Sequence, residues 1–290
     1  MLKAAGLFIG ARVPMLRPSL RFLLITVTLL ALPAPPARAQ GDPFPRTIVD
    51  GTGHAVTVPA RPTTVAAVSD VTALAQIVEG EALRALPLPL PDAPAWDGVG
   101  LLVIPGLYAT AYPALVESAQ AAGVPVFVTA LLHSLDAYRA HVSALGRATG
   151  RDERAAALLR RLDGRIAALR ARLSDVAPVR ALVLTPERYT FGQGTLISDL
   201  IAAAGGVNVA AAAGYGDIRQ LTDAEIRALA PQVVLLTPAW TPQDRANAPA
   251  WPGVRLIAIP FSPTQPADPA AALLALALAL HPLETLGLSR

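Results

Sequence analysis

Aromatic side chains are the residues of this chain best placed to bind a ligand. They follow four short apolar runs that predict β-strands, at 101–104, 181–184, 233–236 and 256–259. In parallel sheets, ligands bind just beyond the carboxyl ends of the strands, where aromatic rings offer large contact surfaces. The alternative is that each ring only plugs the end of its own core. The set predicts a binding cleft with these candidate ligand-contacting residues: Ser69, which directly follows the apolar run at 64–68, Tyr108, Tyr112, Tyr189, Phe191, Tyr215, Trp240 and Phe261.

Catalytic motifs are missing from the sequence. It has neither a G-x-S-x-G nor an H-E-x-x-H pattern. The run Gly192–Ile197 matches G-x-G-x-x-G at only two positions, which argues against a dinucleotide site. Of four scattered histidines, His133 is a possible metal ligand, and His141 is expected on the solvated side of its helix. We therefore predict no catalytic residues and no cofactor, and the metal ligands stay undefined.

Cysteine content and charge exclude further classes. The chain contains no cysteine, which rules out disulfides, thiolate metal sites and cysteine nucleophiles. Its net charge is +3, but residues 1–39 contain five basic residues and no acidic one. The remainder has 19 basic and 21 acidic residues, so nothing indicates a nucleic acid or an anionic membrane surface as partner.

The first 39 residues have the pattern of a cleavable secretory signal. Two arginines precede the apolar run Phe22–Leu32, and Ala37-Arg38-Ala39 forms an A-x-A site. The run is too short to span a membrane, although an uncleaved anchor is the alternative. Either Met1 or Met15 could be the start. No lipid-anchoring cysteine follows, so we expect a free protein in the periplasm.

A long helix organises the rest of the chain. Between residues 152 and 175, apolar residues recur at three- and four-residue steps without a proline: Leu158, Leu162, Ile166, Leu169 and Leu173. We interpret this helix as a strut between two α/β lobes, the alternative being a long surface helix of one domain. The expected organisation is a signal peptide (1–39), an N-terminal lobe (40–150), the interlobe helix (151–176) and a C-terminal lobe (177–290).

Strands and helices alternate on both sides of the strut, which predicts a mostly parallel sheet in each lobe. In the N-terminal lobe we expect a hairpin at 47–58, strands at 64–68, 100–104 and 124–128, and helices at 70–78, 113–122 and 134–149. The proline-rich residues 83–95 are expected to form an extended connection. In the C-terminal lobe we expect strands at 179–184, 232–236 and 254–259, and helices at 196–204, 222–229 and 268–280.

Several segments between residues 46 and 282 resemble the periplasmic binding proteins for iron complexes, haem and vitamin B12. They are TIVDGTGHAVTVPARPTTVAAVS, LGRATGRDERAAAL, FGQGTLISDLIAAAGGVNVAA with its A-G-G-x-N element (Ala204 to Asn208), LTDAEIRALAPQVVLL and the ending at His281-Pro282. The resemblance implies that the chain forms two α/β lobes joined by one long helix. It also implies that the protein is a monomer. It further implies capture of a ferric siderophore, haem or cobalamin for an inner-membrane ATP-binding cassette permease. Tyrosines could ligate haem iron, and the candidates are Tyr108, Tyr112, Tyr189 and Tyr215.

The chain departs from this family at the acids expected to dock on the permease. The position of the C-terminal docking glutamate is Ala224, flanked by Asp223 and Glu225. Thr222 and Glu225 also fit a capping box, in which the Glu225 side chain would bond back to the start of its own helix. In the N-terminal lobe, PLPLPDAPAWDGVG replaces the expected helix, so this lobe is predicted to be shortened. A metal-ion carrier, a periplasmic enzyme and a degenerate homologue that no longer transports stay open as alternatives.

Overall fold

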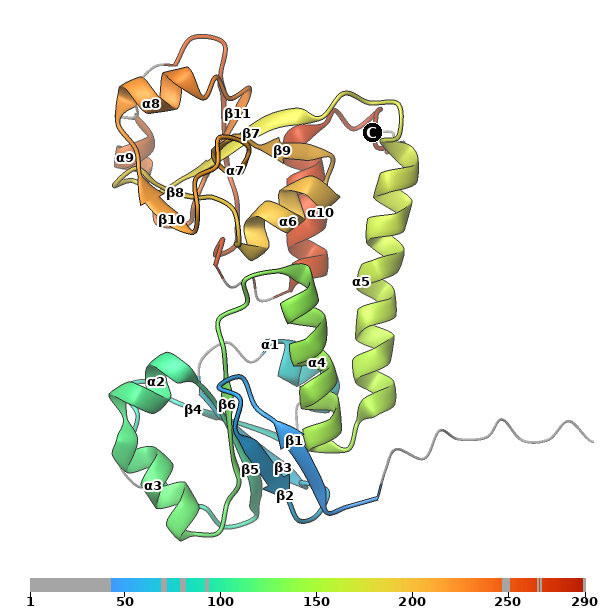
Figure 1. Ribbon diagram of the computed structural model, residues 1–290, viewed down its shortest axis with the longest axis vertical. Helices are drawn as coiled ribbons and strands as arrows, with labels where there is room; N and C mark the ends of the chain where they lie inside the picture. Colours follow the sequence, from blue (N-terminus) through green and yellow to red (C-terminus); the bar gives the residue numbers. More distant parts are fainter. Residues whose placement is uncertain are drawn as a thin grey trace, which may run out of the picture. The chain divides into compact units, whose positions relative to one another are not determined.

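The computed structural model describes residues 43–68, 72–78, 82–91, 94–246, 251–264, 266 and 268–288. The predicted signal at 1–39, Ser69 and Asp92 lie outside these residues. The described residues form one compact unit. Along it the elements alternate between strand and helix, and two separate four-stranded sheets form the framework (Figure 1).

The N-terminal sheet is entirely parallel, with the strand order β4-β3-β5-β6. Its strands are β3 (Thr64–Val68), β4 (Leu83–Leu86), β5 (Val99–Pro105) and β6 (Val126–Thr129). Strand β4 corrects the expectation of a mere connection at 83–95. Its four residues precede the prolines and keep the N–H groups that pair with β3, so the strand can form at the edge of the sheet.

Alternate residues of β3 and β5 point to opposite faces of this sheet, as pleating requires. Ala66 and Leu102 pack toward α3 (Pro113–Ala121), which follows the short α2 (Gly106–Ala111). Val65 and Leu101 pack in the cluster that contains α1 (Thr72–Val78) and α4 (Leu135–Thr149). Ser134 caps α4, and Gly150 ends it in the left-handed conformation. The predicted hairpin is β1 (Arg46–Val49) with β2 (Ala55–Val58).

The C-terminal sheet is parallel too, with the order β12-β11-β7-β9. Its strands are β7 (Val179–Leu184), β9 (Gly206–Asn208), β11 (Val233–Leu236) and β12 (Arg255–Ala258). One face packs on α6 (Leu196–Ala203) and α10 (Pro269–Leu280). The other face is covered by α7 (Val209–Ala212) and α8 (Asp223–Ala228), and α9 (Pro242–Ala246) follows β11. Strands β8 (Tyr189–Phe191) and β10 (Ile218–Gln220) form an antiparallel pair.

Helix α5 (Asp152–Arg172) follows the N-terminal elements and precedes the C-terminal ones. Its 21 residues span about 32 Å at 1.5 Å per residue. Helix α5 packs against α4 and α1 of the N-terminal half and against α10 and α6 of the C-terminal half. Near its start, Arg46 donates to Asp152 over 2.8 Å and to the carbonyl oxygen of Arg147 over 2.9 Å. The predicted α/β fold with parallel sheets is therefore confirmed.

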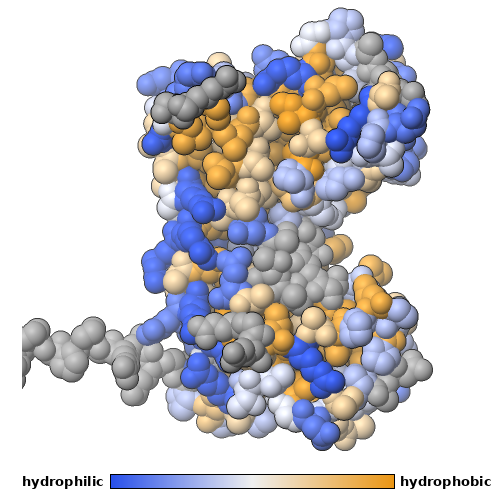
Figure 2. Space-filling model, turned by 180° about the vertical axis from the view of Figure 1, so that it is seen from behind, coloured by the Kyte–Doolittle hydropathy of each residue, from blue (hydrophilic) through white to orange (hydrophobic). Residues whose placement is uncertain are grey.

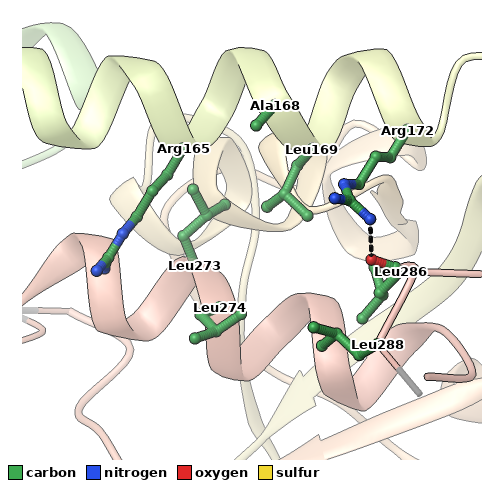
Figure 3. A pocket seen from close by; sticks show the side chains of 8 residues that line it. All are labelled: Arg165, Ala168, Leu169, Arg172, Leu273, Leu274, Leu286 and Leu288. Carbon is green, nitrogen blue, oxygen red and sulfur yellow. Dashed lines mark hydrogen bonds between the residues drawn. The ribbon is translucent and has the colours of Figure 1, made fainter.

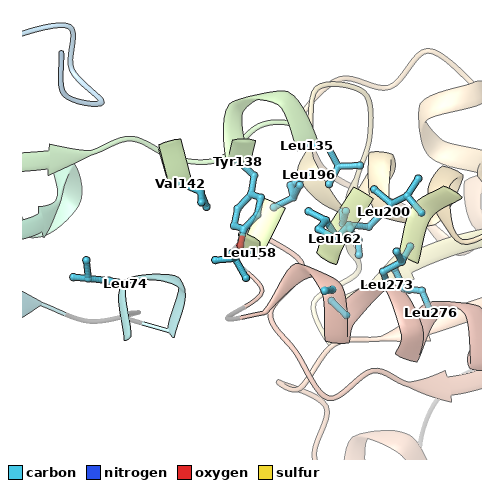
Figure 4. Packing of buried hydrophobic residues seen from close by; sticks show 14 of the residues in the cluster. Leu74, Leu135, Tyr138, Val142, Leu158, Leu162, Leu196, Leu200, Leu273 and Leu276 are labelled. Atoms are coloured by element: carbon cyan, nitrogen blue, oxygen red, sulfur yellow. The ribbon is translucent and has the colours of Figure 1, made fainter. Parts of the chain in front are cut away.

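One apolar cluster, here called the shared core, includes residues before, within and after α5 (Figure 4). Leu74 of α1, Leu162 of α5 and Leu273 of α10 all belong to it and are almost fully buried. A hydrogen bond from the amide of Leu135 to Asp199 Oδ2, 2.9 Å long, links α4 to α6. No helix among the described residues is both long enough and apolar enough to cross a membrane.

Candidate functional site

The carboxyl edge of the N-terminal sheet carries two of the predicted tyrosines. Strand β5 ends at Pro105, which pairs with Thr129 at the end of β6, so the loops after both strands start side by side. Tyr108 and Tyr112 lie one helical turn apart on and after α2. Their rings stack with centroids 6.4 Å apart and planes 25° apart. Both rings are half-buried against the cluster beneath α2 and α3, so each still offers surface to a ligand.

The same edge exposes three leucines that the sequence patterns did not single out. Leu88, Leu107 and Leu131 are 54, 77 and 64% exposed. Each lies two residues beyond the last residue of a strand: β4, β5 and β6 respectively. In the sequence, only their equal distance from the strand ends could have indicated these leucines. That distance could be recognised only once β4 was known to be a strand.

The structure distributes the C-terminal candidates over different environments. Phe191 is buried in the shared core and Trp240 in the apolar cluster on the other face of the C-terminal sheet. Trp240 Nε1 donates to the carbonyl oxygen of Leu184 over 2.8 Å. This placement fits the alternative in which these rings plug the core. Tyr189 is the most exposed of the C-terminal aromatic candidates, and Phe261 is half-buried against the shared core.

Tyr215 and Asn208 hold the strand pair β8–β10 in place. The Arg219 guanidinium lies over the Tyr215 ring, 4.2 Å from its centroid. Asn208, the last residue of the A-G-G-x-N element, donates through Nδ2 to the carbonyl oxygen of Phe191 over 2.7 Å. The motif therefore has a structural role. The buried side-chain amide of Asn208 pairs with the Phe191 carbonyl oxygen and so joins β9 to β8.

Both acids considered for docking are paired with arginines of their own half. Glu225 completes the capping box with Thr222, whose amide and hydroxyl donate to its Oε2 over 2.8 and 2.9 Å. Arg219 Nη2 donates to its other carboxylate oxygen. The hydrogen bonds from Thr222, followed by the charge of Arg219, lower the pKa of Glu225. Asp223 lies 3.4 Å from Arg188, so neither carboxylate is free of a local partner.

The histidines do not assemble a metal site. No group of three or more His, Cys, Asp or Glu residues within the described ranges could hold an ion. His133 is exposed after β6. His141 corrects the expectation of a solvated position, because it is half-buried on α4 and burial lowers its pKa to about 4. The next residue, Val142, is fully buried, and α4 packs against both α5 and α1.

Surface cavities open in both halves. One of about 1000 Å³ lies between the hairpin, α3 and β6, with Asp50, Thr57 and Gln120 in its lining. Another of about 240 Å³ lies between α5, α10 and the C-terminal residues. Its walls are mainly leucines, and Arg172 Nη1 donates to the carbonyl oxygen of Leu286 at its edge (Figure 3). Apolar side chains also gather on the surface of the C-terminal half (Figure 2).

Comparison with known proteins gives a consistent result. Residues 107–248 match the family model described as a periplasmic binding protein. No curated protein sequence matches the chain. Among solved structures, the apo periplasmic haem-binding protein RhuT from Roseiflexus sp. RS-1 is 23% identical, covering 75% of this chain and 99% of its own, with a TM-score of 0.58. At these identities the likeness to solved structures shows the fold.

Two further structures have the same fold and carry different cargo. The molybdate-binding protein MolA of Haemophilus influenzae is 16% identical, covering 81% of this chain and 91% of its own, with a TM-score of 0.61. CeuE of Helicobacter pylori, in a nickel–histidine complex, is 15% identical, covering 83% and 90%, also with a TM-score of 0.61.

Proposed function

We propose that this chain is a periplasmic binding protein, the family whose model matches residues 107–248, and that it captures a metal chelate or tetrapyrrole between its two halves. Ferric siderophores, haem and cobalamin are the candidate ligands, and an inner-membrane ATP-binding cassette permease is the proposed recipient. The observation that carries the proposal is the half-buried, stacked pair Tyr108–Tyr112 at the carboxyl end of β5, inside the segment that matches the family. Stacked rings of this kind suit a large planar ligand.

Capture requires binding groups and no reacting groups. We assign contact with the ligand to Tyr108 and Tyr112 first and to Tyr189 second, because these rings keep exposed surface. Ser69, Phe191, Tyr215, Trp240 and Phe261 complete the proposed set, with the buried Phe191 and Trp240 acting as supports behind it. If the ligand is haem, a tyrosine oxygen could ligate its iron, as implied for Tyr108, Tyr112, Tyr189 and Tyr215. The mature protein is proposed to begin after residue 39 and to act as a periplasmic monomer.

Docking on the permease is assigned to the surface around Asp223 and Glu225. An arginine of the permease would have to compete there with Arg188 and Arg219 of this chain. We therefore expect a weak, readily reversible contact whose strength falls with salt, as exposed ion pairs do. Reversible docking is what a carrier that must leave the permease after delivery needs.

A titration tests this function. Residues 40–290 are titrated with haem, cyanocobalamin and several ferric siderophores while tryptophan fluorescence and the visible absorbance of the ligand are followed. We expect saturable binding of at least one chelate with micromolar or lower Kd. Loss of a shifted haem band in Tyr108→Phe or Tyr189→Phe would identify an iron ligand. If the folded protein binds none of these ligands, the proposal is wrong, and a parallel titration with Zn²⁺ and Mn²⁺ would test the metal-ion carrier instead.

A further inference from the structure

The described residues that directly follow β4, β5 and β6, at the carboxyl edge of the N-terminal sheet, include no acid, lysine or arginine. They are residues 87–91, 106–112 and 130–134. The loop after β3, which contains Asp70, and Asp92 further along the segment after β4 lie outside the described residues. A carrier that recognised an anionic chelate here would need arginine or lysine donors at this edge. The lack of basic residues therefore favours a ligand that brings no negative charge to this edge.

The same loops expose apolar surface at regular places. Leu88, Leu107 and Leu131 each lie two residues beyond a strand end, and more than half of each side chain is exposed. Pairing of Leu86 with Val68 and of Pro105 with Thr129 sets the three strand ends at similar heights. Since β4 and β6 are three strand spacings apart, the leucines mark an apolar edge about 14 Å wide. Single exposed leucines are common, but a row at one edge of a sheet indicates a binding surface.

The opposite half adds little charge of its own. The turn between β7 and β8 contains Glu187 and Arg188, and Arg188 lies 3.4 Å from Asp223. The loop 237–241 that follows β11 is uncharged, as are the residues 259–264 that follow β12. A ligand held at these strand ends therefore meets mainly tyrosine rings, leucines and hydroxyl groups, and the charged residues of the turn after β7 are Glu187 and the Asp223-paired Arg188. Binding of this kind depends on the fit of apolar surfaces and responds weakly to salt.

We infer that the ligand presents an uncharged, largely apolar face to the edge formed by Leu88, Leu107 and Leu131. The inference rests on the proposed function and narrows its ligand class. Chelates with an aliphatic or aromatic face and no charge on that face are favoured over polyanionic catecholate or carboxylate siderophores. Leu107 and Leu131 follow adjacent strands and form the centre of the contact, beside the rings of Tyr108 and Tyr112.

The test compares leucine variants by titration with whichever chelate of the panel binds most tightly. Leu107→Asp and Leu131→Asp each place a charge on the proposed edge at a site that is already exposed. Leu274→Asp on α10 is the control, because Leu274 is also an exposed leucine, at 44%, but belongs to a helix rather than to a loop beyond a strand end. We expect each edge variant to raise Kd at least tenfold and the control to leave it within twofold, with all three retaining the melting temperature of the wild type.

A second comparison varies the ligand charge directly. Haem and haem dimethyl ester share one macrocycle and differ by two carboxylates. The ester should bind at least as tightly as haem, and a rise in NaCl from about 0.05 to 0.5 M should change its Kd less than twofold. Binding that is tight but unchanged by the leucine variants, or that needs the carboxylates, would overturn the inference while the carrier function stands. Absence of binding by every chelate would overturn the carrier function and the inference with it.

Discussion

His141 gives the folded chain a sensitivity to mild acid. Its burial on α4 lowers its pKa from 6.5 to about 4, because a charged imidazolium would lose its hydration there. In the unfolded chain the side chain regains its ordinary pKa. Between these two values the unfolded state binds a proton that the folded state does not bind. The contribution of neutral His141 to stability is therefore complete above pH 6.5 and is lost progressively as the pH falls toward 4.

The size of the effect follows from the shift. A difference of about 2.5 pKa units corresponds to roughly 3 kcal/mol of unfolding free energy. This is a large share of the roughly 5–15 kcal/mol by which domains are stable. Urea unfolding followed by tryptophan fluorescence, between about pH 7.5 and 4.5, measures it. The wild type should lose about 2–3 kcal/mol more than His141→Gln over this range. The exposed His133→Gln is the matched control and should follow the wild type.

Other acids must be separated from this effect. Burial raises the pKa of Asp50, but hydrogen bonds from Thr52, His54 and Val128 outweigh it and lower that pKa overall. Asp50 therefore also loses stabilising bonds as the pH falls, and it does so equally in the wild type and in the His141 variant. The difference between the two curves isolates His141. Parallel curves for the wild type and His141→Gln would refute the reasoning, because they would mean that the histidine titrates alike in both states.

Three further substitutions test the packing and hydrogen bonds of the fold. Leu162→Ala leaves a void in the shared core and should cost about 2–5 kcal/mol in urea unfolding, while a cost below 1 kcal/mol would contradict its burial. Gly192→Ala should destabilise the β8–β10 pair, since a Cβ would clash with the carbonyl oxygen of Tyr215, and unchanged thermal stability would contradict this packing. Arg172→Ala removes the bond to the Leu286 carbonyl and should speed proteolysis of the C-terminal residues. Cleavage at the wild-type rate would show that the bond does not hold them.

The fold was largely predictable because its signals are local. The apolar runs of β3, β7 and β11 are buried on both faces, so they appear as continuous apolar stretches bounded by helix patterns. The stripe of α5 is equally visible, although the helix ends at Arg172 rather than at 175. Strand β4 was missed because it is short, half exposed and followed by prolines, so only its pairing with β3 defines it.

The candidate site was less predictable, because distance from a strand end does not determine which way a ring points. Tyr108 and Trp240 both follow strands. Tyr108 keeps exposed surface on a short helix, whereas Trp240 turns back and bonds to the carbonyl oxygen of Leu184. The direction depends on which neighbouring groups need a hydrogen-bond partner, and that is decided by tertiary contacts. The exposed leucines were missed because apolar side chains are expected in the interior of a protein.

The shared core limits how the protein can close on a ligand. Leu158 and Leu162 of α5 pack in one apolar cluster with Leu74 of α1 and with Leu273 and Leu276 of α10 (Figure 4). A large rotation of one half against the other would separate these side chains and expose them, at about 25 cal/mol for each Å² of apolar surface. We therefore expect capture by small movements of the loops beyond the strand ends. Small-angle scattering with and without a bound chelate should show nearly equal radii of gyration, and a marked compaction would mean that the cluster divides when the ligand binds.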